Sequence, residues 1–572
     1  MCMTFIAGRA ASVTGRVMVA HNEDDTGCVA VRHGYVPAAD WPEGTLLPAE
    51  PGCAAIPQVA HTHGYYWSEV RGAEGGFSTS DSFYNDCGVL VTSNSCMRSR
   101  ENLDDPDRLT QGGISYNLRR AVAERASTAR DGLKILIELV TSWGYAPSAR
   151  AYTVADSREA FMVQIASGRH YMAARIPDGH VCVMPNHYTL HGLNDLPEMY
   201  YPDDLVSYAI ERGWYVPAVD GCYDDFDFAR AYQAPELLMH PENTLRHRHS
   251  LQMLLGRHWE AETLPFSVPA PEPVTRERLM DMLSNHYAGT DDDLRIGPGR
   301  SPHDTANRRV CTATTVESFV CEFDVDPRLT TLWTAFGRPC QQPWLPLHPL
   351  CGLPREVQVM EDPAGEMARH LLPDPNAVSW QDSGWQRFRD FGNALEMVYA
   401  DTIDAVQAQN HALYVQAVRE NDAAVASARA TKACGQSDAT RMLLRDVAQR
   451  QTSAALNALQ ELAQTHFRQA VVHTSGPVPL RRDGVCTLSF TCPVCPVESS
   501  LRLGVCRETD HSQYACCVPG SLVNEGDGLY RADFPANPIH ARTAPGIHEC
   551  FLGGASADAT PFTGTLQVLI VS

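Results

Sequence analysis

The chain has 572 residues, 44% of them hydrophobic and 20% charged, which predicts a globular protein with a sizeable core in about three or four units. Lysine and arginine number 46 against 68 aspartates and glutamates, giving a net charge of −22. This balance, without any long basic run, argues against nucleic acid or an anionic membrane as the main partner.

The first residues carry no basic-then-apolar leader, and no apolar run reaches the length of a membrane span. The 19 cysteines are scattered and odd in number, a usage that suits a reducing compartment. We therefore expect a soluble protein of the cytoplasm with no membrane partner.

The first predicted element is a β-hairpin. Residues 4–11 and 16–21 are rich in β-forming and small residues, and the second strand runs into the polar segment 21–24. Cys2 stands at the head of this hairpin. Removal of Met1 would leave a thiol and a free α-amino group on one residue, a self-contained nucleophile and base. By position alone, however, an unpaired cysteine near a chain end is more often inert.

The next predicted strand covers 87–94, and an apolar repeat near 3.6 residues predicts a helix over 117–142. Three short strands follow, at 151–165, 171–176 and 180–184. The turn Pro177-Asp178-Gly179 joins the last two. Because hairpin-type links rather than βαβ crossovers connect these strands, we expect antiparallel sheets covered by helices, an α+β fold.

Composition changes twice in the second half of the chain. Residues 385–470 carry two apolar stripes with helical spacing, and the stretch after Pro477 is β-like, punctuated by proline and glycine, and holds seven cysteines. We predict three parts: a core at 2–380, a helical segment at 381–470 packed on it, and a β-rich module of unknown role at 478–572.

One cysteine group invites a zinc hypothesis. Its members are Cys492, Cys495, Cys506, His511, Cys516 and Cys517. The first pair has ligand spacing, but no second Cys-x-x-Cys follows, so free structural thiols are the default. Phosphate loops, dinucleotide fingerprints and His-Glu-x-x-His are not found in the sequence. We expect no metal and no cofactor.

A series of short blocks runs in order through residues 2–425. Besides the opening from Cys2 to Asp24, it includes Gly88-Val89-Leu90-Val91-Thr92, Val183-Met184-Pro185-Asn186, His286-Tyr287-Ala288-Gly289-Thr290 and Arg309-Val310-Cys311-Thr312. This series resembles the PepD-type dipeptidases, which are N-terminal-cysteine peptidases of the N-terminal nucleophile (Ntn) hydrolase superfamily. Each block alone is weak; their number and order carry the resemblance. Residues 478–572 lie outside it.

The resemblance implies the αββα sandwich of Ntn hydrolases, in which two antiparallel sheets pack face to face between helical layers. It also implies a cysteine dipeptidase that cleaves the amide bond of a small peptide substrate. The Cys2 thiolate would form a thioester with the substrate, and the free α-amino group would act as the base. Relatives often assemble from several copies, so a homo-oligomer is one expected state.

Five further residues take roles from the resemblance. Asn186 occupies the position of the asparagine that binds the oxyanion, and Asn94 is a second candidate donor. Asp24 matches the acid that holds the free α-amino group, and Arg246 lies near an arginine block that would bind a substrate carboxylate. His21 departs from the family, whose members usually have arginine there. Taken without the resemblance, these residues equally suit turns, strand ends and surface charges.

Two alternatives stay open. The chain could be an Ntn amidase of the acylase type, acting on N-acyl amides, since relatives also cleave penicillin V and conjugated bile salts. It could instead be a catalytically silent binding protein on the same fold, because fold alone does not decide function. His21 bears on both alternatives, since a histidine in place of arginine could alter or abolish activity.

Overall fold

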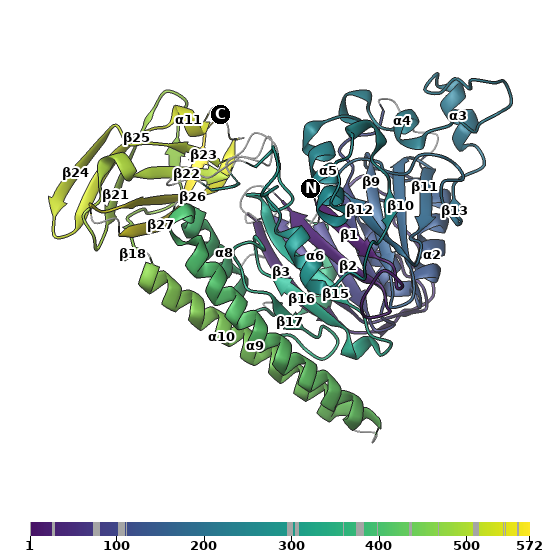
Figure 1. The fold of residues 1–572 in the computed structure, drawn as a ribbon, viewed down its shortest axis with the longest axis horizontal. Helices are drawn as coiled ribbons and strands as arrows, with labels where there is room; N and C mark the ends of the chain where they lie inside the picture. The colour runs from purple at the N-terminus through teal and green to yellow at the C-terminus, as the bar shows by residue number, and fades with distance from the viewer. Residues whose placement is uncertain are drawn as a thin grey trace.

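The structure is a computed structural model. It describes residues 2–25, 29–72, 80–100, 109, 111–293, 301–303, 308–358, 360–372, 383–396, 398–433, 437–466, 468–506, 514–540, 543, 545–557 and 560–571. Within these residues the fold is α+β, with 11 α-helices and several antiparallel sheets. The first half of the chain forms the body that holds the two largest sheets, and the C-terminal residues form a separate β-rich body (Figure 1).

Two large antiparallel sheets form the core of the first body. In spatial order the first sheet contains β14 (Ser267–Pro269), β12 (His180–Met184), β1 (Met3–Ala7), β2 (Met18–Asp24), β15 (Thr315–Glu322), β16 (Thr331–Ala335) and β17 (Leu345–Leu347). The second contains β13 (Met199–Tyr200), β11 (His170–Arg175), β10 (Ala160–Ser167), β9 (Arg150–Ala155), β8 (Leu90–Ser95), β7 (Ser80–Asn85), β6 (Tyr65–Gly72) and β3 (Val29–Val36). β1 thus lies inside its sheet, between β12 and β2.

Three large hydrophobic cores contain side chains from the two large sheets, and a smaller cluster packs Tyr65, Trp67 and Phe83 of the second sheet against Met360 and Met367. One core joins the two sheets through side chains such as Ile6 and Val19 from the first and Met162 and Met172 from the second. A second core packs α5 (Pro241–Leu255) and α6 (Arg276–Leu283) against β1 and β2. A third packs α1 (Asn117–Arg125) and α2 (Ala129–Trp143) against β8, β9 and β10. Because strand side chains alternate between faces, both faces of β1 and β2 are buried.

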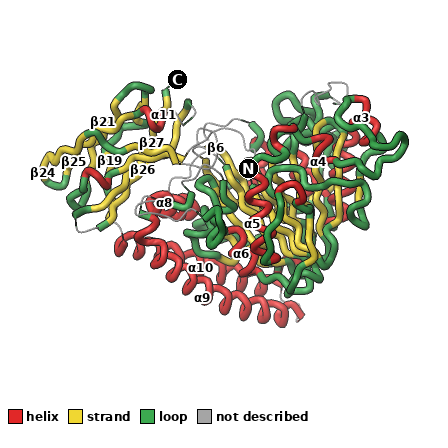
Figure 2. Tube along the Cα trace, turned by 45° about the horizontal axis from the view of Figure 1, so that its top comes forward, coloured by secondary structure: helices red, strands yellow, loops and turns green. Residues whose placement is uncertain are grey.

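Three helices follow the sheets: α8 (Gly384–Glu396), α9 (Tyr399–Ala433) and α10 (Ser437–His466). The long helices α9 and α10 lie side by side and run along the first body (Figures 1 and 2). Glycine and polar residues at 435–438 separate their two apolar stripes, as the sequence predicts. Among the described residues no helix, these two included, is long and apolar enough to cross a membrane.

The C-terminal module packs two further sheets around its own core. One contains β18 (Arg468–Gln469), β27 (Pro561–Ile570), β26 (Gly546–Ala555), β22 (Arg502–Cys506) and β23 (Tyr514–Cys517), with β20 (Val478–Leu480) paired to β27. The other contains β19 (Val471–Val472), β21 (Val485–Thr491), β25 (Leu529–Pro535) and β24 (Ser521–Gly526). The module contacts the rest of the chain through α8 and α10. The remaining elements are short: β4 (Ala39–Asp40), β5 (His61–Thr62), α3 (Leu205–Glu211), α4 (Phe228–Tyr232), α7 (Pro363–Arg369) and α11 (Asn537–His540).

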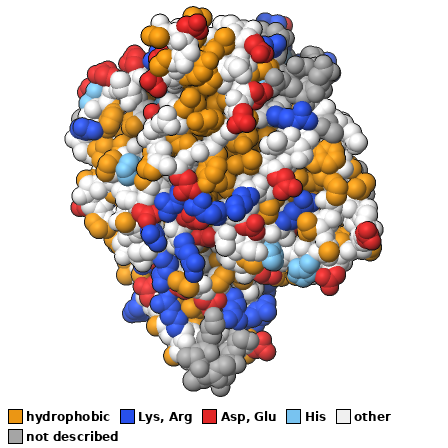
Figure 3. Space-filling model, turned by 90° about the vertical axis from the view of Figure 1, so that its right-hand side faces the viewer, with side chains coloured by type: hydrophobic (Ala, Val, Ile, Leu, Met, Phe, Trp, Pro, Cys, Tyr) orange, Lys and Arg blue, Asp and Glu red, His pale blue; other side chains and the backbone are white. Residues whose placement is uncertain are grey.

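Side chains of one kind gather on one face of the protein. On the face that points away from the C-terminal module, hydrophobic side chains gather in a band, and Lys and Arg side chains form a row across the middle (Figure 3).

Three predictions of local structure were wrong in detail. The helix predicted over 117–142 is two helices, because Ala126 is extended and the Thr128 side chain caps α2 by accepting from the Asp131 backbone N–H. The strand predicted over 151–165 is the hairpin β9–β10, whose turn is held by the Asp156 carboxylate. The turn at 177–179 does not close a hairpin: β11 belongs to the second sheet and β12 to the first. The N-terminal hairpin, the antiparallel sheets, the late helices and the β-rich end are confirmed.

The close approach of β1 to this turn explains Gly8. Its backbone N–H donates to the His180 carbonyl at 2.9 Å. A Cβ at Gly8 would collide with the Pro177 carbonyl and lie 2.6 Å from the Asp178 carbonyl oxygen, whereas a Cβ at Gly179, in the same turn, would meet nothing within 4 Å.

We predict that Gly8→Ala destabilises the first body by about 1–3 kcal/mol, because the added methyl has no room. Thermal unfolding followed by circular dichroism should show a lower midpoint for Gly8→Ala and an unchanged one for Gly179→Ala. Equal midpoints for both variants and the parent would show that the turn yields freely and that this packing argument is wrong.

Candidate active site

Cys2 lies at the head of β1 and is 3% exposed. β1 pairs with β2 in a register that sets Thr4 against His21 and Met3 against Asn22. Continued by one residue, this register brings Cys2 opposite Glu23. The side chains confirm the pairing, since the Cys2 Sγ donates to the Glu23 Oε1 at 3.2 Å. The hairpin thus brings an acid to the sulfur.

The polar residues of this hairpin divide between the two faces of the first sheet. Those on the face toward the second sheet, in line with Ile6 and Val19 of the core between the sheets, are Cys2, Thr4, His21 and Glu23. Asn22 and Asp24 point to the other face. There the Asn22 side-chain amide donates to the carbonyls of Leu283 and Val310, both at 2.9 Å.

His21 occupies the centre of a buried network. Its Nδ1 lies 2.8 Å from the Thr4 Oγ1, and its Nε2 lies 3.2 Å from the Glu23 Oε2. The Thr4 hydroxyl donates its one hydrogen to the Asn94 Oδ1 at 2.7 Å, so it accepts from the Nδ1–H of His21. Because a carboxylate only accepts, the Nε2 of His21 also carries a hydrogen. The geometry therefore calls for an imidazolium.

The electrostatics of this pair agree with its geometry. Burial lowers the pKa of His21, but its hydrogen bonds with Cys2 and Glu23 outweigh burial and raise that pKa from 6.5 to about 9. Burial raises the pKa of Glu23, but the hydrogen bond to His21 and the neighbouring positive charge together outweigh burial and bring the pKa to about 2. Both side chains are thus charged at neutral pH, and a cation lies beside the Cys2 sulfur.

Arg246, from α5, ties the backbone of Cys2 to Asn186. It is fully buried. One Nη donates to the Cys2 carbonyl at 3.2 Å, and the other donates to the Asn186 Oδ1 at 2.7 Å and to the Asn243 Oδ1 at 2.9 Å. Its Nε donates to the Glu242 carbonyl at 2.7 Å. Burial and the nearby charge of another arginine lower its pKa to about 10.

These contacts bear on the role predicted for Arg246. The guanidinium is buried, so it is not a surface charge, and its hydrogen bonds run to the protein. The physical reason is its helix: α5 packs against β1 and β12 and directs this side chain under the end of both strands. Arg246 thus contacts both Cys2 and Asn186. Binding of a substrate carboxylate by Arg246 stays a prediction.

The two candidate oxyanion donors differ in their bonding. Asn186 directly follows Pro185 at the end of β12, and its Nδ2 donates to the Ser95 carbonyl at 2.5 Å. The Nδ2 of Asn94 donates to the carbonyl of Met184 at 3.0 Å and lies 3.4 Å from that of Pro185. Both amide hydrogens of Asn94 therefore point to backbone carbonyls at the end of β12. Asn94 holds the strand that presents Asn186.

Asp24 lies on the face of β2 opposite to the Cys2 sulfur. Its Oδ1 accepts from the Thr315 hydroxyl at 2.7 Å, and the Arg308 Nη1 lies 3.8 Å from its Oδ2. Burial raises the pKa of Asp24, and the charge of Arg308 offsets this only in part. The structure thus joins Cys2, His21, Asn94, Asn186 and Arg246 in one network and places Asp24 behind it.

Sequence reasoning missed two members of the site. Glu23 lies within the polar segment 21–24, but no role was predicted for it. Its i,i+2 spacing from His21 on a strand indicates that both side chains share the face of Cys2. Arg308 comes from a part of the chain far from Asp24, and no local pattern points to it. Of the cysteine group that invited the zinc hypothesis, Cys506, His511 and Cys516 fall outside the described side chains. Cys492 and Cys517 are buried cysteines and Cys495 is an exposed one, none of them in a disulfide.

Comparison with known proteins identifies the family of the chain. The sequence pattern of peptidase family C69 matches residues 1–356, more than half of the chain. The chain belongs to peptidase family C69. It is therefore a peptidase, a hydrolase of peptide bonds. The family match ends before α8, so the late helices and the C-terminal module of this C69 peptidase lie outside it.

Individual relatives are distant. This C69 peptidase is 21% identical over 367 residues to a protein named probable dipeptidase from Latilactobacillus sakei, covering 60% of this chain and 73% of that protein. It is 24% identical over 377 residues to a probable dipeptidase from Salmonella dublin, covering 61% and 80%. It is also 23% identical over 313 residues to a probable dipeptidase B from Lactococcus lactis, covering 53% and 64%.

The charged state of His21 predicts a pH dependence of stability. Since its pKa rises from 6.5 to about 9 in the folded chain, its contribution is fully present below pH 6.5 and is lost as pH rises through 9. We expect the free energy of unfolding of the parent to fall over this window more steeply than that of His21→Asn, measured by urea unfolding. The exposed His61 is the control, and His61→Asn should keep the parental slope. Equal slopes for His21→Asn and the parent would contradict a buried imidazolium.

Proposed function

We propose that this C69 peptidase is a cysteine dipeptidase whose nucleophile is Cys2 after removal of Met1. The observation that carries the proposal is the position of Cys2: its sulfur touches Glu23 beside a cationic His21, and its carbonyl is tied through Arg246 to Asn186. The names of the distant relatives support dipeptides as the substrate class. The two packed sheets with helices on their outer faces support the αββα sandwich of Ntn hydrolases.

The proposed reaction proceeds in two halves. The α-amino group of Cys2, with an ordinary pKa of about 8, accepts the thiol proton, and the sulfur attacks the amide carbonyl of the substrate. The C–N bond then breaks, the amine leaves with the proton, and a thioester remains on Cys2. Water, activated by the same amino group, adds to the thioester and releases the second product together with the regenerated thiol.

His21 supplies the positive charge that family relatives usually obtain from arginine. A cation beside a sulfur stabilises the thiolate, which is the reactive form. Glu23 keeps this imidazolium protonated and oriented, and Thr4 fixes its other nitrogen. The replacement of arginine by histidine thus preserves the charge but makes it titratable, so activity should decline once pH exceeds the His21 pKa of about 9.

Asn186 is the proposed oxyanion donor. An amide nitrogen carries two hydrogens, and one of them is directed to the Ser95 carbonyl. The second would bind the negative oxygen that forms when the sulfur attacks. Arg246 accounts for the orientation of this amide, because it holds the Oδ1 of Asn186. For Asp24 we propose an indirect role. Its buried carboxylate lies beside Arg308, and the balance of these two charges stabilises the end of β1 that carries the α-amino group.

We predict that the mature protein has lost one methionine and that Cys2→Ala abolishes dipeptide hydrolysis, because no other group supplies the sulfur. Cys495→Ala, which removes an exposed thiol in the C-terminal module, should leave turnover unchanged. Intact mass and hydrolysis of a dipeptide panel, compared with N-acyl amino acids, measure both. Hydrolysis of N-acyl amides alone would favour the acylase alternative, and dipeptide hydrolysis by Cys2→Ala would overturn the mechanism.

The two asparagines give a second prediction. Loss of one oxyanion donor typically lowers kcat by about 10²–10³. We expect this loss, with a smaller change in KM, for Asn186→Ala. Asn94→Ala should act mainly by lowering the unfolding midpoint, since it releases the end of β12. Steady-state kinetics and thermal unfolding of both variants separate the roles. If Asn94→Ala shows the larger loss of kcat, the donor has been assigned to the wrong residue.

A further inference from the structure

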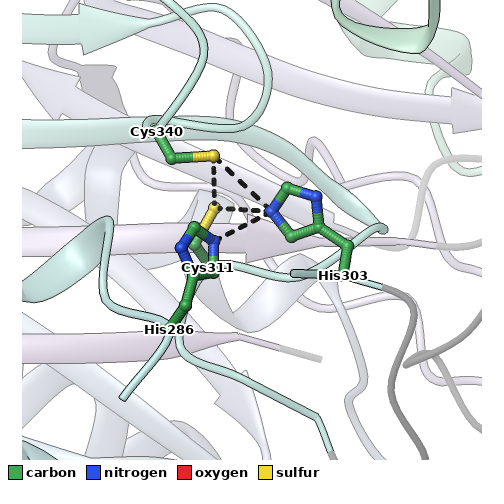
Figure 4. Close-up of side chains that lie close together, drawn as sticks. All are labelled: His286, His303, Cys311 and Cys340. Carbon is green, nitrogen blue, oxygen red and sulfur yellow. Dashed lines mark hydrogen bonds between the residues drawn. The ribbon is translucent and has the colours of Figure 1, made fainter. Parts of the chain in front are cut away.

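A second cluster of reactive side chains lies outside the active site. His286, His303, Cys311 and Cys340 converge from four separate segments of the chain, with all their ligand atoms within 4.8 Å of one another (Figure 4). His286 follows α6, Cys311 precedes β15, and Cys340 follows β16. His303, Cys311 and Cys340 are buried, and His286 is partly buried. The mechanism proposed above uses none of them.

Hydrogen bonds do not account for this arrangement. The Nε2 of His303 lies 3.0 Å from the Nε2 of His286, 3.4 Å from the Cys311 Sγ and 3.5 Å from the Cys340 Sγ. A ring nitrogen has either one hydrogen or one lone pair, so it cannot serve three partners at once. The Figure 4 view shows the three neighbours grouped around this one nitrogen.

The distances instead match the edges of a metal-centred tetrahedron. With Zn–S near 2.3 Å and Zn–N near 2.0–2.1 Å, tetrahedral geometry sets S···S at about 3.8 Å, N···S at about 3.6 Å and N···N at about 3.3 Å. The Cys311 and Cys340 sulfurs lie 3.5 Å apart. The four separations given are therefore shorter than these edges by about 0.1–0.3 Å, and a small outward movement of the side chains would admit the ion.

A carboxylate next to the four side chains also fits a metal site. The Nδ1 of His303 lies 2.8 Å from the Oε1 of Glu396, a buried residue of α8, and 3.0 Å from the Ser301 hydroxyl. Histidines that bind a metal commonly donate their other ring N–H to a carboxylate, which fixes the ring and turns the free nitrogen toward the ion. The Gln341 side chain donates to the same Glu396 oxygen.

We propose that His286, His303, Cys311 and Cys340 bind one Zn²⁺ in a closed structural site. Two thiolates and two imidazoles in tetrahedral array select zinc, and four protein ligands leave no position for a substrate or a catalytic water. The ion joins the end of α6 to the segments that enter β15 and leave β16. The ion thereby fixes the chain segment that places Arg308 beside Asp24. This site stands independently of the proposed dipeptidase activity.

The test measures metal in the full-length protein, produced with zinc in the medium and purified with reductant and without chelators. We expect about one zinc per chain by elemental analysis, and less than a tenth of that in Cys311→Ser/Cys340→Ser. Two matched controls should keep the full zinc content: Cys2→Ala, which alters the active-site group of Cys2, His21 and Glu23, and Cys492→Ser/Cys495→Ser in the C-terminal module.

Two further measurements keep the proposal testable if the double variant fails to fold. Cys340→His retains a ligand at the fourth position and should keep the zinc. The parent protein, stripped with a chelator and reloaded with Co²⁺, should show thiolate-to-cobalt charge-transfer absorption and the visible bands of tetrahedral cobalt. Removal of the metal should lower the unfolding midpoint, and added zinc should restore it.

Three results would overturn the proposal. One is parent protein that contains less than a tenth of an equivalent of zinc and takes up neither Zn²⁺ nor Co²⁺ under reducing conditions. Another is a disulfide between Cys311 and Cys340 in protein whose thiols were blocked at lysis. The third is loss of zinc from Cys2→Ala with retention in Cys311→Ser/Cys340→Ser, which would place the ion in the active site.

Discussion

The antiparallel pairing of β1 with β2 decides where the groups of the candidate site lie. Its register sets Thr4 against His21, and one residue further it brings Cys2 to Glu23. A slip of one residue would turn His21 and Glu23 to the opposite face of the sheet and replace them with Asn22 and Asp24. Both faces of this hairpin are buried, so the hydrophobic side chains of both cores hold the register that the chemistry requires.

Charge is the second constraint on the site. The His21–Glu23 pair is removed from water, and such a pair is tolerable only when its remaining hydrogen-bonding groups are satisfied. Thr4 and Thr92 contact the imidazole, and Cys2 contacts the carboxylate, so the network meets this requirement. Arg246 stands under the same strands and is satisfied by carbonyl and amide oxygens. The side chains of the candidate site therefore form one continuous hydrogen-bonded network.

The late helices are integrated with the core although the family match ends at residue 356. Glu396 of α8 bonds to His303 of the proposed zinc site. Asn410 of α9 donates to the Gln341 carbonyl at 2.8 Å, and Asn421 of the same helix lies 2.8 Å from the Nε2 of His348. These buried polar contacts fix α8 and α9 against the segment that holds Cys340. The helical segment is thus packed against the C69 core through these polar contacts.

The sequence predicted those features that follow from a local residue pattern or from the order of the blocks that resemble the family. The N-terminal hairpin follows from a short run of β-forming residues around a turn, and the positions of Cys2 and Asn186 follow from the blocks that contain them. Contacts between distant segments were beyond its reach. No spacing rule assigns β11 and β12 to different sheets or buries Arg246 beneath Cys2. The four proposed zinc ligands are spread over 286–340 without a Cys-x-x-Cys pair, so only the fold brings them together.

The central claim is that the substrate is transferred to Cys2 of a chain that begins with that residue. Rapid acid quench of the enzyme during turnover of a dipeptide, followed by mass spectrometry of its N-terminal peptide, tests this directly. The account predicts a peptide that starts at Cys2 and carries the mass of the first substrate residue, on sulfur or, after transfer during work-up, on the adjoining α-amine. An enzyme that turns over with Met1 in place, or with the substrate residue attached elsewhere, would contradict it.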